Sequence, residues 1–152
     1  MATLEETILQ EHIALYRSDP VAAHDLDSTR FGGEGLVPTL LLTTTGRRSG
    51  KQRLAPLLYQ PSGRGFIVVA SNGGAPGNPY WYTNLRFNPA CTVQVGKILY
   101  RAGACMLARG ERAPYWDWMV RMWPPYARYQ ELTEREIPVL ALDPTEVLKI
   151  MA

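Results

Sequence analysis

The sequence predicts an α+β domain in which an antiparallel β-barrel carries peripheral helices. Its 152 residues are the usual size of one domain, and neither a linker nor an internal repeat divides them. About six runs of β-branched and other apolar residues are bounded by Gly, Pro and Asn, as is typical of strands joined by turns. Helical segments flank these runs instead of alternating with each one. We therefore expect a single domain over residues 1–152.

The first segment is predicted to be a helix over residues 3–18. Thr3 and the glutamate three positions later have the spacing of a capping box. An apolar stripe recurs at helical spacing and should face the core; it consists of Leu9, Ile13 and Tyr16. A short second helix is expected at residues 21–27, before a cluster of glycines breaks the chain.

The middle of the chain predicts three strands and one helix. The strands are expected to form a meander, and they are residues 37–45, 53–60 and 66–70. The third run is too apolar to have a solvated face. A helix is expected at residues 80–87, with Asn78 as its capping residue and Pro79 at its first position.

The last third predicts a hairpin, further helices and one more strand. The hairpin joins residues 92–96 to 98–108 through Gly96 and Lys97. A helix over residues 111–122 is interrupted by two prolines, and a short helical piece bearing Tyr126 and Tyr129 follows. The segments predicted after it are a strand at residues 137–142 and a helix at about 144–151, which Asp143 to Glu146 would cap.

Charge is distributed unevenly along the chain. The formal net charge is only +2, yet no Asp or Glu occurs between Glu34 and Glu111. Nine cations lie in that interval, and Arg outnumbers Lys by thirteen to three in the whole sequence. Arginine pairs two oxygens at once, so phosphate or carboxylate groups are the expected partners of this basic middle. A solvated surface is the alternative.

The basic residues concentrate in the stretch TTTGRRSGKQR at 43–53, which joins two predicted strands. Glycines allow a ligand to approach the backbone, hydroxyls and amides donate to phosphate oxygens, and arginines add charge. The spacing of a P-loop is absent. An exposed turn remains the alternative, whereas nucleic-acid binding is not expected because the cations cluster in one turn and no recognised motif is present.

A second glycine-rich stretch, SNGGAPG at 71–77, leads into the predicted helix at residue 80. Free amides at a helix start favour an anion or a carbonyl group. Three aromatic residues begin that helix, and core packing competes with ring contact as their role. The two cysteines and two histidines have no metal-ligand spacing, so no metal is expected. No segment resembles a signal peptide or a membrane span, which favours a cytoplasmic protein.

Several segments occur together in the order of a known family. They are LLTTTGRRSG at 41–50, ASNGGAP at 70–76, PYWYTNL at 79–85, NP at 88–89, YARYQ at 126–130 and TEREIPV at 133–139. This pattern resembles the deazaflavin-dependent nitroreductase family over about residues 37–144. The resemblance implies a split β-barrel of the FMN-binding type over about residues 37–143. It also implies coenzyme F420, a deazaflavin with a phosphodiester and a polyglutamate tail, whose reduced form F420H2 gives hydride to quinones or nitro compounds.

The same resemblance assigns roles by position. The cofactor-binding residues it implies are Arg47, Arg48, Ser49, Arg53, Leu54, Ala55, Pro56, Leu57, Val69, Ala70, Ser71, Asn72, Tyr80, Trp81, Tyr82, Thr83 and Asn84. Tyr126 and Tyr129 would line the substrate side and serve as proton donors or packing groups, with Trp81 and Trp123 completing an apolar slot. Asn72 stands where similar sequences often have a basic residue, so tail binding should differ here.

The predicted function is an F420H2-dependent reductase acting on a menaquinone-like quinone or a nitroaromatic compound, in which the cofactor supplies the chemistry. Two alternatives remain: a non-catalytic deazaflavin carrier, and an FMN-dependent oxidoreductase on the same fold. A quinone substrate suggests transient peripheral association with the inner face of the membrane through the apolar strip of the first helix.

Overall fold

The computed structural model describes residues 4–31 and 33–152. The predicted cap at Thr3 lies outside the described residues. The helical elements are α1 (Leu4–Ser18), α2 (Pro20–His24), η1 (Ser28–Phe31), η2 (Asn72–Gly74), α3 (Tyr80–Phe87), α4 (Arg109–Met122) and α5 (Pro125–Glu131). The strands are β1 (Asp25–Asp27), β2 (Leu36–Thr45), β3 (Gln52–Leu58), β4 (Gln60–Ser62), β5 (Gly65–Val69), β6 (Ala90–Val95), β7 (Ile98–Met106) and β8 (Val139–Ile150).

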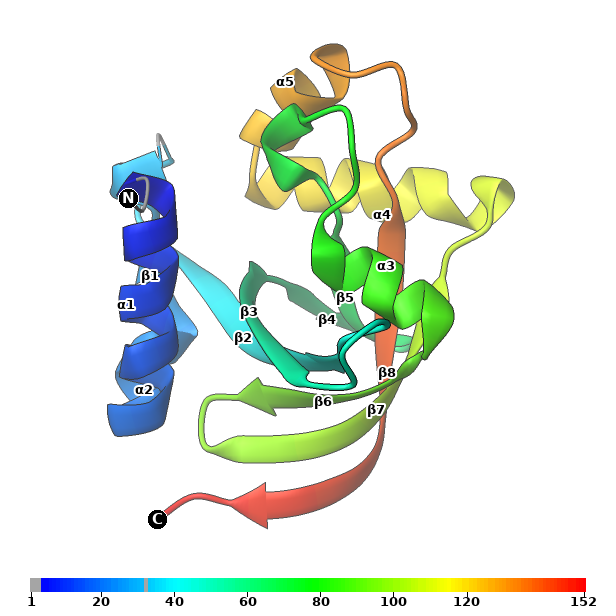
Figure 1. The fold of residues 1–152 in the computed structure, drawn as a ribbon. Coiled ribbons are helices and arrows are strands. Elements are labelled where there is room, and N and C mark those ends of the chain that lie inside the picture. The colour runs from blue at the N-terminus through cyan, green and yellow to red at the C-terminus, as the bar shows by residue number, and fades with distance from the viewer. Residues whose placement is uncertain (1–3, 32) are drawn as a thin grey trace.

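All eight strands belong to one sheet with the order β1-β2-β6-β7-β8-β5-β4, and β3 pairs with β2 beside this path. Every pairing is antiparallel. The sheet curls on itself, with α1 at one side and α3, α4 and α5 gathered at another (Figure 1). This architecture confirms the predicted α+β class and its antiparallel split barrel.

Two buried clusters lie on opposite faces of the central strands. Leu40, Val68 and Leu140 belong to the cluster inside the curl, whereas Ile67 and Val139 belong to one beneath α4 and α5. Side chains alternate across a strand, so β5 and β8 each supply both clusters. This explains why the run at residues 66–70 is apolar throughout, because neither of its faces meets solvent.

The predicted meander is wrong in its last pairing. β2 and β3 form the expected hairpin, but β5 pairs with β4 and β8 instead of β3. β3 ends at Leu58 and β4 begins at Gln60. Tyr59 lies between them, and its backbone N–H donates to the carbonyl of Pro38 at 3.3 Å. The strand predicted at residues 53–60 is therefore two strands, and the second one turns back to pair with β5.

The predicted C-terminal helix at about residues 144–151 is wrong, because β8 continues as a strand to Ile150. The capping signature around Asp143 is a local signal, whereas β7 supplies pairing partners for β8 out to Ile150. Pro144 is accommodated next to a register shift in the pairing with β7. The pairing of β8 with β5 ends at Leu142, so the N–H that Pro144 lacks costs no hydrogen bond to β5.

The N-terminal region follows the predicted helix closely but not completely. Ile13 and Tyr16 are buried as expected, whereas Leu9 is 41% exposed. The segment predicted as a helix at residues 21–27 is instead the short α2 followed by β1, which pairs with β2. No helix among the described residues is both long and apolar enough to cross a membrane.

The helix predicted at residues 80–87 is confirmed as α3, although its cap is not as expected. Pro79 occupies the N-cap position and no side chain caps this helix. The amide oxygen of Asn78 instead accepts a hydrogen bond from Arg135 at 2.9 Å. The predicted hairpin of β6 and β7 and the helical piece bearing Tyr126 and Tyr129 are confirmed.

Candidate active site

The turn between β2 and β3, residues 46–51, is named the basic loop. Thr45 and Gln52 are paired at its base. Inside it, the N–H of Gly46 donates to the carbonyl of Lys51 at 2.7 Å, and the N–H of Gly50 donates to the carbonyl of Gly46 at 2.9 Å. Gly50 has a φ of 70°, which a residue with a side chain adopts only with strain. The loop therefore holds its shape with its own backbone.

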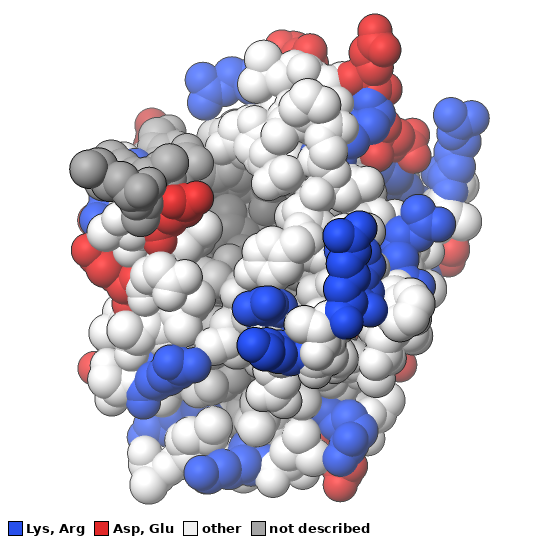
Figure 2. Space-filling view, in the orientation of Figure 1, with Lys and Arg blue, Asp and Glu red and all other residues white. Residues whose placement is uncertain are grey.

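The cations of the basic loop point to solvent without partners. The side chains of Arg47, Arg48 and Lys51, and of Arg53 just after the loop, are exposed and form no ion pair with any described residue. Figure 2 shows several Lys and Arg side chains near the centre of the face and others along its edges, whereas the acidic side chains lie toward its margins. An unopposed group of cations attracts anions, and guanidinium groups grip oxyanions with two donors each.

Asn84 of α3 positions the basic loop through hydrogen bonds of its side chain. Its amide oxygen accepts from the backbone N–H of Arg47 at 3.2 Å, and its amide nitrogen donates to the hydroxyl of Thr44 at 3.1 Å. Asn84 is 3% exposed, so its bond to Thr44 is shielded from water, whereas its bond to the exposed residue Arg47 is partly buried. Asn84, predicted to contact the cofactor, is thus placed to align the loop.

The segment 71–78, named the glycine loop, is held by one distant guanidinium. Arg135 donates to the carbonyls of Ser71 at 2.8 Å and Ala75 at 3.1 Å, and to the side chain of Asn78 at 2.9 Å. Gly74 packs so closely on α5 that an added Cβ would lie 2.7 Å from the carbonyl oxygen of Tyr129. The N–H of Gly74 also donates to the carbonyl of Ser71 at 2.9 Å, so the glycine loop combines its own backbone bonds with support from residues more than fifty positions later in the chain.

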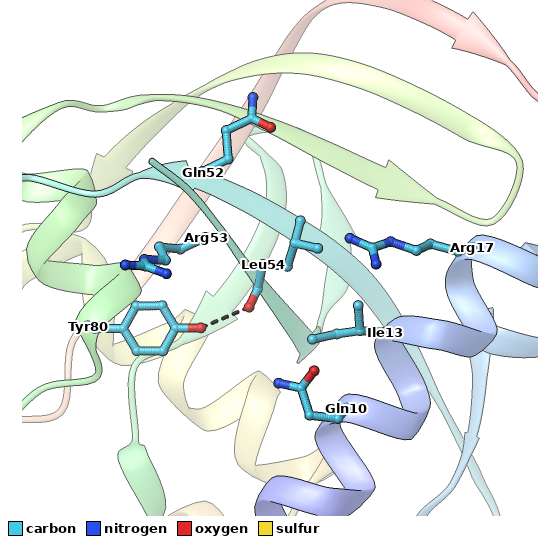
Figure 3. Close-up of a pocket in the computed structure, with 7 residues that line it drawn as sticks. All are labelled: Gln10, Ile13, Arg17, Gln52, Arg53, Leu54 and Tyr80. Atoms are coloured by element: carbon cyan, nitrogen blue, oxygen red, sulfur yellow. Dashed lines mark hydrogen bonds between the residues drawn. The ribbon is translucent and has the colours of Figure 1, made fainter. Parts of the chain in front are cut away.

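A cavity of about 460 Å³ opens between α1 and β3, beside the start of α3 (Figure 3). Its lining residues are Gln10, Ile13, Arg17, Gln52, Arg53, Leu54 and Tyr80. The Tyr80 hydroxyl donates to the carbonyl of Leu54 at 2.8 Å, which ties α3 to β3. Partial burial raises the pKa of Tyr80, and the charge of Arg53 opposes that rise.

Three predicted cofactor residues, Arg53, Leu54 and Tyr80, meet in this cavity. Others have their side chains in the protein interior, and these are Ala55, Val69, Ala70 and Trp81. The half-buried ones are Pro56, Leu57, Ser71, Tyr82 and Thr83. Asn72 is exposed at a positive φ of 49°, and its amide donates to the carbonyl of Gly77 at 3.0 Å. Ser49 is exposed, and its hydroxyl accepts from the N–H of Lys51.

The two predicted substrate-side tyrosines lie together on α5. Their ring centroids are 6.2 Å apart with an interplanar angle of 74°. Tyr126 is 5% exposed, and burial raises the pKa of its phenol. Trp123 belongs to the same cluster, whereas Trp81 belongs to the cluster inside the curl. The slot expected from all four rings is thus divided between two clusters.

Sequence reasoning missed four residues of this region. Gln10 and Arg17 line the cavity from α1, a segment without a distinctive motif, and Gln52 joins them from β3. Arg135 lay within a segment similar to the family but had no assigned role. The spacing of Gln10, Ile13 and Arg17 on one helical face was the available signal, and it does not indicate what that face meets.

Comparison with known proteins identifies the family. A family model described as F420H(2)-dependent quinone reductase matches residues 16–144. An F420H(2)-dependent quinone reductase of Mycobacterium tuberculosis is 32% identical over 145 residues, which are 89% of this chain and 89% of the relative.

Solved structures of similar sequence share the fold. An F420-H2 dependent reductase, FDR-A, is 41% identical with a TM-score of 0.64, over 70% of this chain and 94% of that one. A second structure, described as a domain-swapped dimer, is 41% identical with a TM-score of 0.65, over 70% of this chain and 80% of that one. Together, a family match over most of the chain and a shared fold show that this chain belongs to the F420H(2)-dependent quinone reductase family.

Proposed function

We propose that the chain transfers a hydride from F420H2 to a quinone on the face that carries the basic loop, the glycine loop and the cavity beside Tyr80. Membership of the family confirms the predicted reductase class, the coenzyme and quinone reduction. The observation that supports this location is the group of exposed cations at residues 47–53, which form no ion pair with a described residue and of which Arg53 lines the cavity.

The residues present fit an anionic deazaflavin. The phosphodiester and glutamates of F420 need several separate positive groups, and the side chains of Arg47, Arg48, Lys51 and Arg53 are exposed without acidic partners among the described residues. FMN carries one terminal phosphate and would leave most of this charge unmatched. The FMN alternative from the sequence is therefore the weaker one.

The protein holds and orients the cofactor, which supplies the hydride of its reduced ring when it is bound. Arg47, Arg48 and Ser49 would bind the phosphodiester and tail. Asn84 fixes the backbone of Arg47 through a partly buried hydrogen bond, so the loop meets the tail in one orientation. Preorganised charge avoids the cost of ordering the loop during binding.

The ring would lie along β3 and the end of β5. The backbone from Leu54 to Leu57 and the segments 69–72 and 80–84 would border it, as the sequence predicts. The buried side chain of Trp81 supports this wall from inside. Arg135 keeps the glycine loop in place through carbonyl contacts, so its role is one of positioning.

Tyr126 and Tyr129 would meet the quinone. Burial raises the pKa of Tyr126, so its phenol stays protonated at neutral pH and can donate to an oxygen that gains charge. Tyr126→Phe and Tyr129→Phe, made as separate variants, distinguish packing from donation: a donor role predicts slower turnover at saturating quinone for the variant concerned, and unchanged turnover removes that role.

Binding and turnover measurements test the function. The apo-protein is titrated with F420 and, separately, with FMN, and the reduced F420 complex is then mixed with a soluble menaquinone analogue. Tight F420 binding and quinone-dependent oxidation of F420H2 are expected. Binding of F420 without oxidation would establish a non-catalytic carrier, and tight binding of FMN alone would overturn the assignment of F420 as the cofactor. A nitroaromatic acceptor in the same assay tests the predicted nitro activity.

Two further features of the proposal concern partners. A relative of 41% identity is described as a domain-swapped dimer, so a dimer is the assembly to test by light scattering. Peripheral membrane contact stays a prediction, with a constraint: Ile13 and Tyr16 are buried in the described fold and do not offer an apolar strip while α1 is docked. Flotation with anionic vesicles would detect such contact.

A further inference from the structure

We propose that Arg17 of α1 binds the anionic tail of the cofactor, so that the N-terminal helix and β3 grip the tail from opposite sides of the cavity. This inference rests on the proposed function and deepens it, because it assigns a binding residue outside the family-like motifs. It also gives α1 a role in ligand recognition in addition to its packing on the sheet.

The face of α1 that meets the cavity is defined by spacing. Gln10, Ile13 and Arg17 follow one another at intervals of three and four, so they lie in a row on one side of the helix. Figure 3 shows Arg17 extending from α1 toward Leu54, with Arg53 on the far side of Leu54. Arg17 is exposed and forms no ion pair with a described residue.

A buried polar anchor fixes this face in position. The Tyr16 hydroxyl donates to the carbonyl of Thr39 on β2, and His12 bonds the Thr39 hydroxyl at 2.9 Å. That hydroxyl donates in turn to the carbonyl of Ala23 at 2.7 Å. Tyr16 is 1% exposed, so the residue next to Arg17 is locked against the sheet. The guanidinium of Arg17 therefore starts from a fixed backbone.

The chemistry of the cavity selects the ligand class. Two arginines, two glutamines and Tyr80 supply its polar lining, and no acidic residue is among the described residues that line it. Guanidinium groups on opposite walls match a ligand with several separate anionic groups, such as a phosphodiester followed by carboxylates. A quinone is neutral and would gain little from two cations. The glutamyl tail is therefore the occupant that the lining favours.

The test compares two ligands that differ only in the tail. Dissociation constants for F420 and for its chromophore without the phosphodiester and glutamates are measured by fluorescence at fixed salt. Arg17→Gln should weaken F420 binding about tenfold, or about 1.4 kcal/mol, and leave the tail-less chromophore within about twofold. Arg17→Lys should recover part of the loss, because it restores the charge without the fork.

Matched variants distinguish direct binding by Arg17 from an effect of the overall charge of the protein. Arg121→Gln removes the same charge from an exposed site on α4 and should leave both constants within about twofold. Gln10→Glu adds a carboxylate to the cavity face of α1 and should weaken F420 binding but not binding of the tail-less chromophore. Far-UV and near-UV circular dichroism would verify that each variant keeps the fold.

Three outcomes would overturn the role of Arg17. Unchanged F420 affinity in Arg17→Gln removes it, and an equal loss for both ligands assigns the effect to the ring or to helix docking. A raised KM for quinone with an unchanged F420 constant places Arg17 on the substrate side. Failure of the wild-type protein to bind F420 would instead refute the proposed function, and it is recognised before any variant is made.

Discussion

The basic loop and the glycine loop are both glycine-containing turns on the proposed cofactor face, but arginine serves them in opposite ways. The basic loop is closed by its own backbone, with Gly46 bonded to Lys51 and Gly50. Its cations are left without partners among the described residues. The glycine loop is held from outside, because Arg135 donates to its carbonyls.

The difference separates two uses of arginine that look alike in a sequence. A guanidinium directed at carbonyls of its own chain defines a shape and is not available to a ligand. One that extends from a turn closed by its backbone is available, and the fold does not depend on it. Substitutions in the two loops should therefore alter different quantities: the free energy of unfolding in one, ligand affinity in the other.

The largest expected effect is that of Arg135→Gln. The variant leaves two carbonyls of the glycine loop, those of Ser71 and Ala75, without a charged donor, and we expect the free energy of unfolding to fall by about 2–3 kcal/mol. Urea denaturation measures it. Arg128→Gln on α5 is the control, because Arg128 is exposed and should change stability by less than about 0.5 kcal/mol. Equal changes in the two variants would contradict the external support of the loop.

Gly74→Ala should have the next largest effect. Gly74 has a φ of 82°, and an added Cβ would collide with the backbone of Tyr129. We expect a loss of about 2 kcal/mol in unfolding free energy. Gly73→Ala is the matched control, with a φ of 62° and open space around the new methyl group, and should lose about 1 kcal/mol from backbone strain alone. Indistinguishable losses would show that the packing on α5 is unimportant.

The double variant Arg47→Gln, Arg48→Gln should show the opposite pattern. Neither side chain pairs with a described residue, so the midpoint of urea unfolding should stay within error of the wild type. The F420 dissociation constant should rise about 30-fold, or about 2 kcal/mol, and its salt dependence should become shallower. A loss of stability without a loss of affinity would reverse the roles assigned to the two loops.

The smallest expected effect belongs to Asn84→Ala, which tests whether the basic loop needs any support. The variant removes the partly buried bond to the N–H of Arg47 and the buried bond to the hydroxyl of Thr44. We expect F420 affinity to fall about fivefold, or about 1 kcal/mol, as the loop loses its fixed orientation. Fluorescence titration measures the change. An unaltered affinity would show that the backbone closure of the loop is sufficient.

Local signals in the sequence predicted the elements that local physics determines. The β-branched run before Gly46, the turn at Gly96 and the proline before Tyr80 each indicated the correct element. The Asp-Pro-Thr-Glu signature at residues 143–146 failed, because pairing with β7 outweighs a helix cap. The roles of Arg135 and Arg17 depend on contacts between distant segments, and periodicity within one segment does not identify the partner.

The position of β8 in the sheet has a consequence for fluctuations of the protein. β8 lies between β7 and β5, and its first four residues pair with β5 from Val139 opposite Val69 to Leu142 opposite Phe66. The β4–β5 hairpin thus joins the rest of the sheet through β8, and the glycine loop follows directly after β5. Amide hydrogens of β5 and of the first half of β8 should then exchange with solvent through one shared opening event. An opening of that short pairing would separate the β4–β5 hairpin from β8 while the pairing of β2, β6 and β7 remained intact, and the glycine loop would keep its bonds to Arg135.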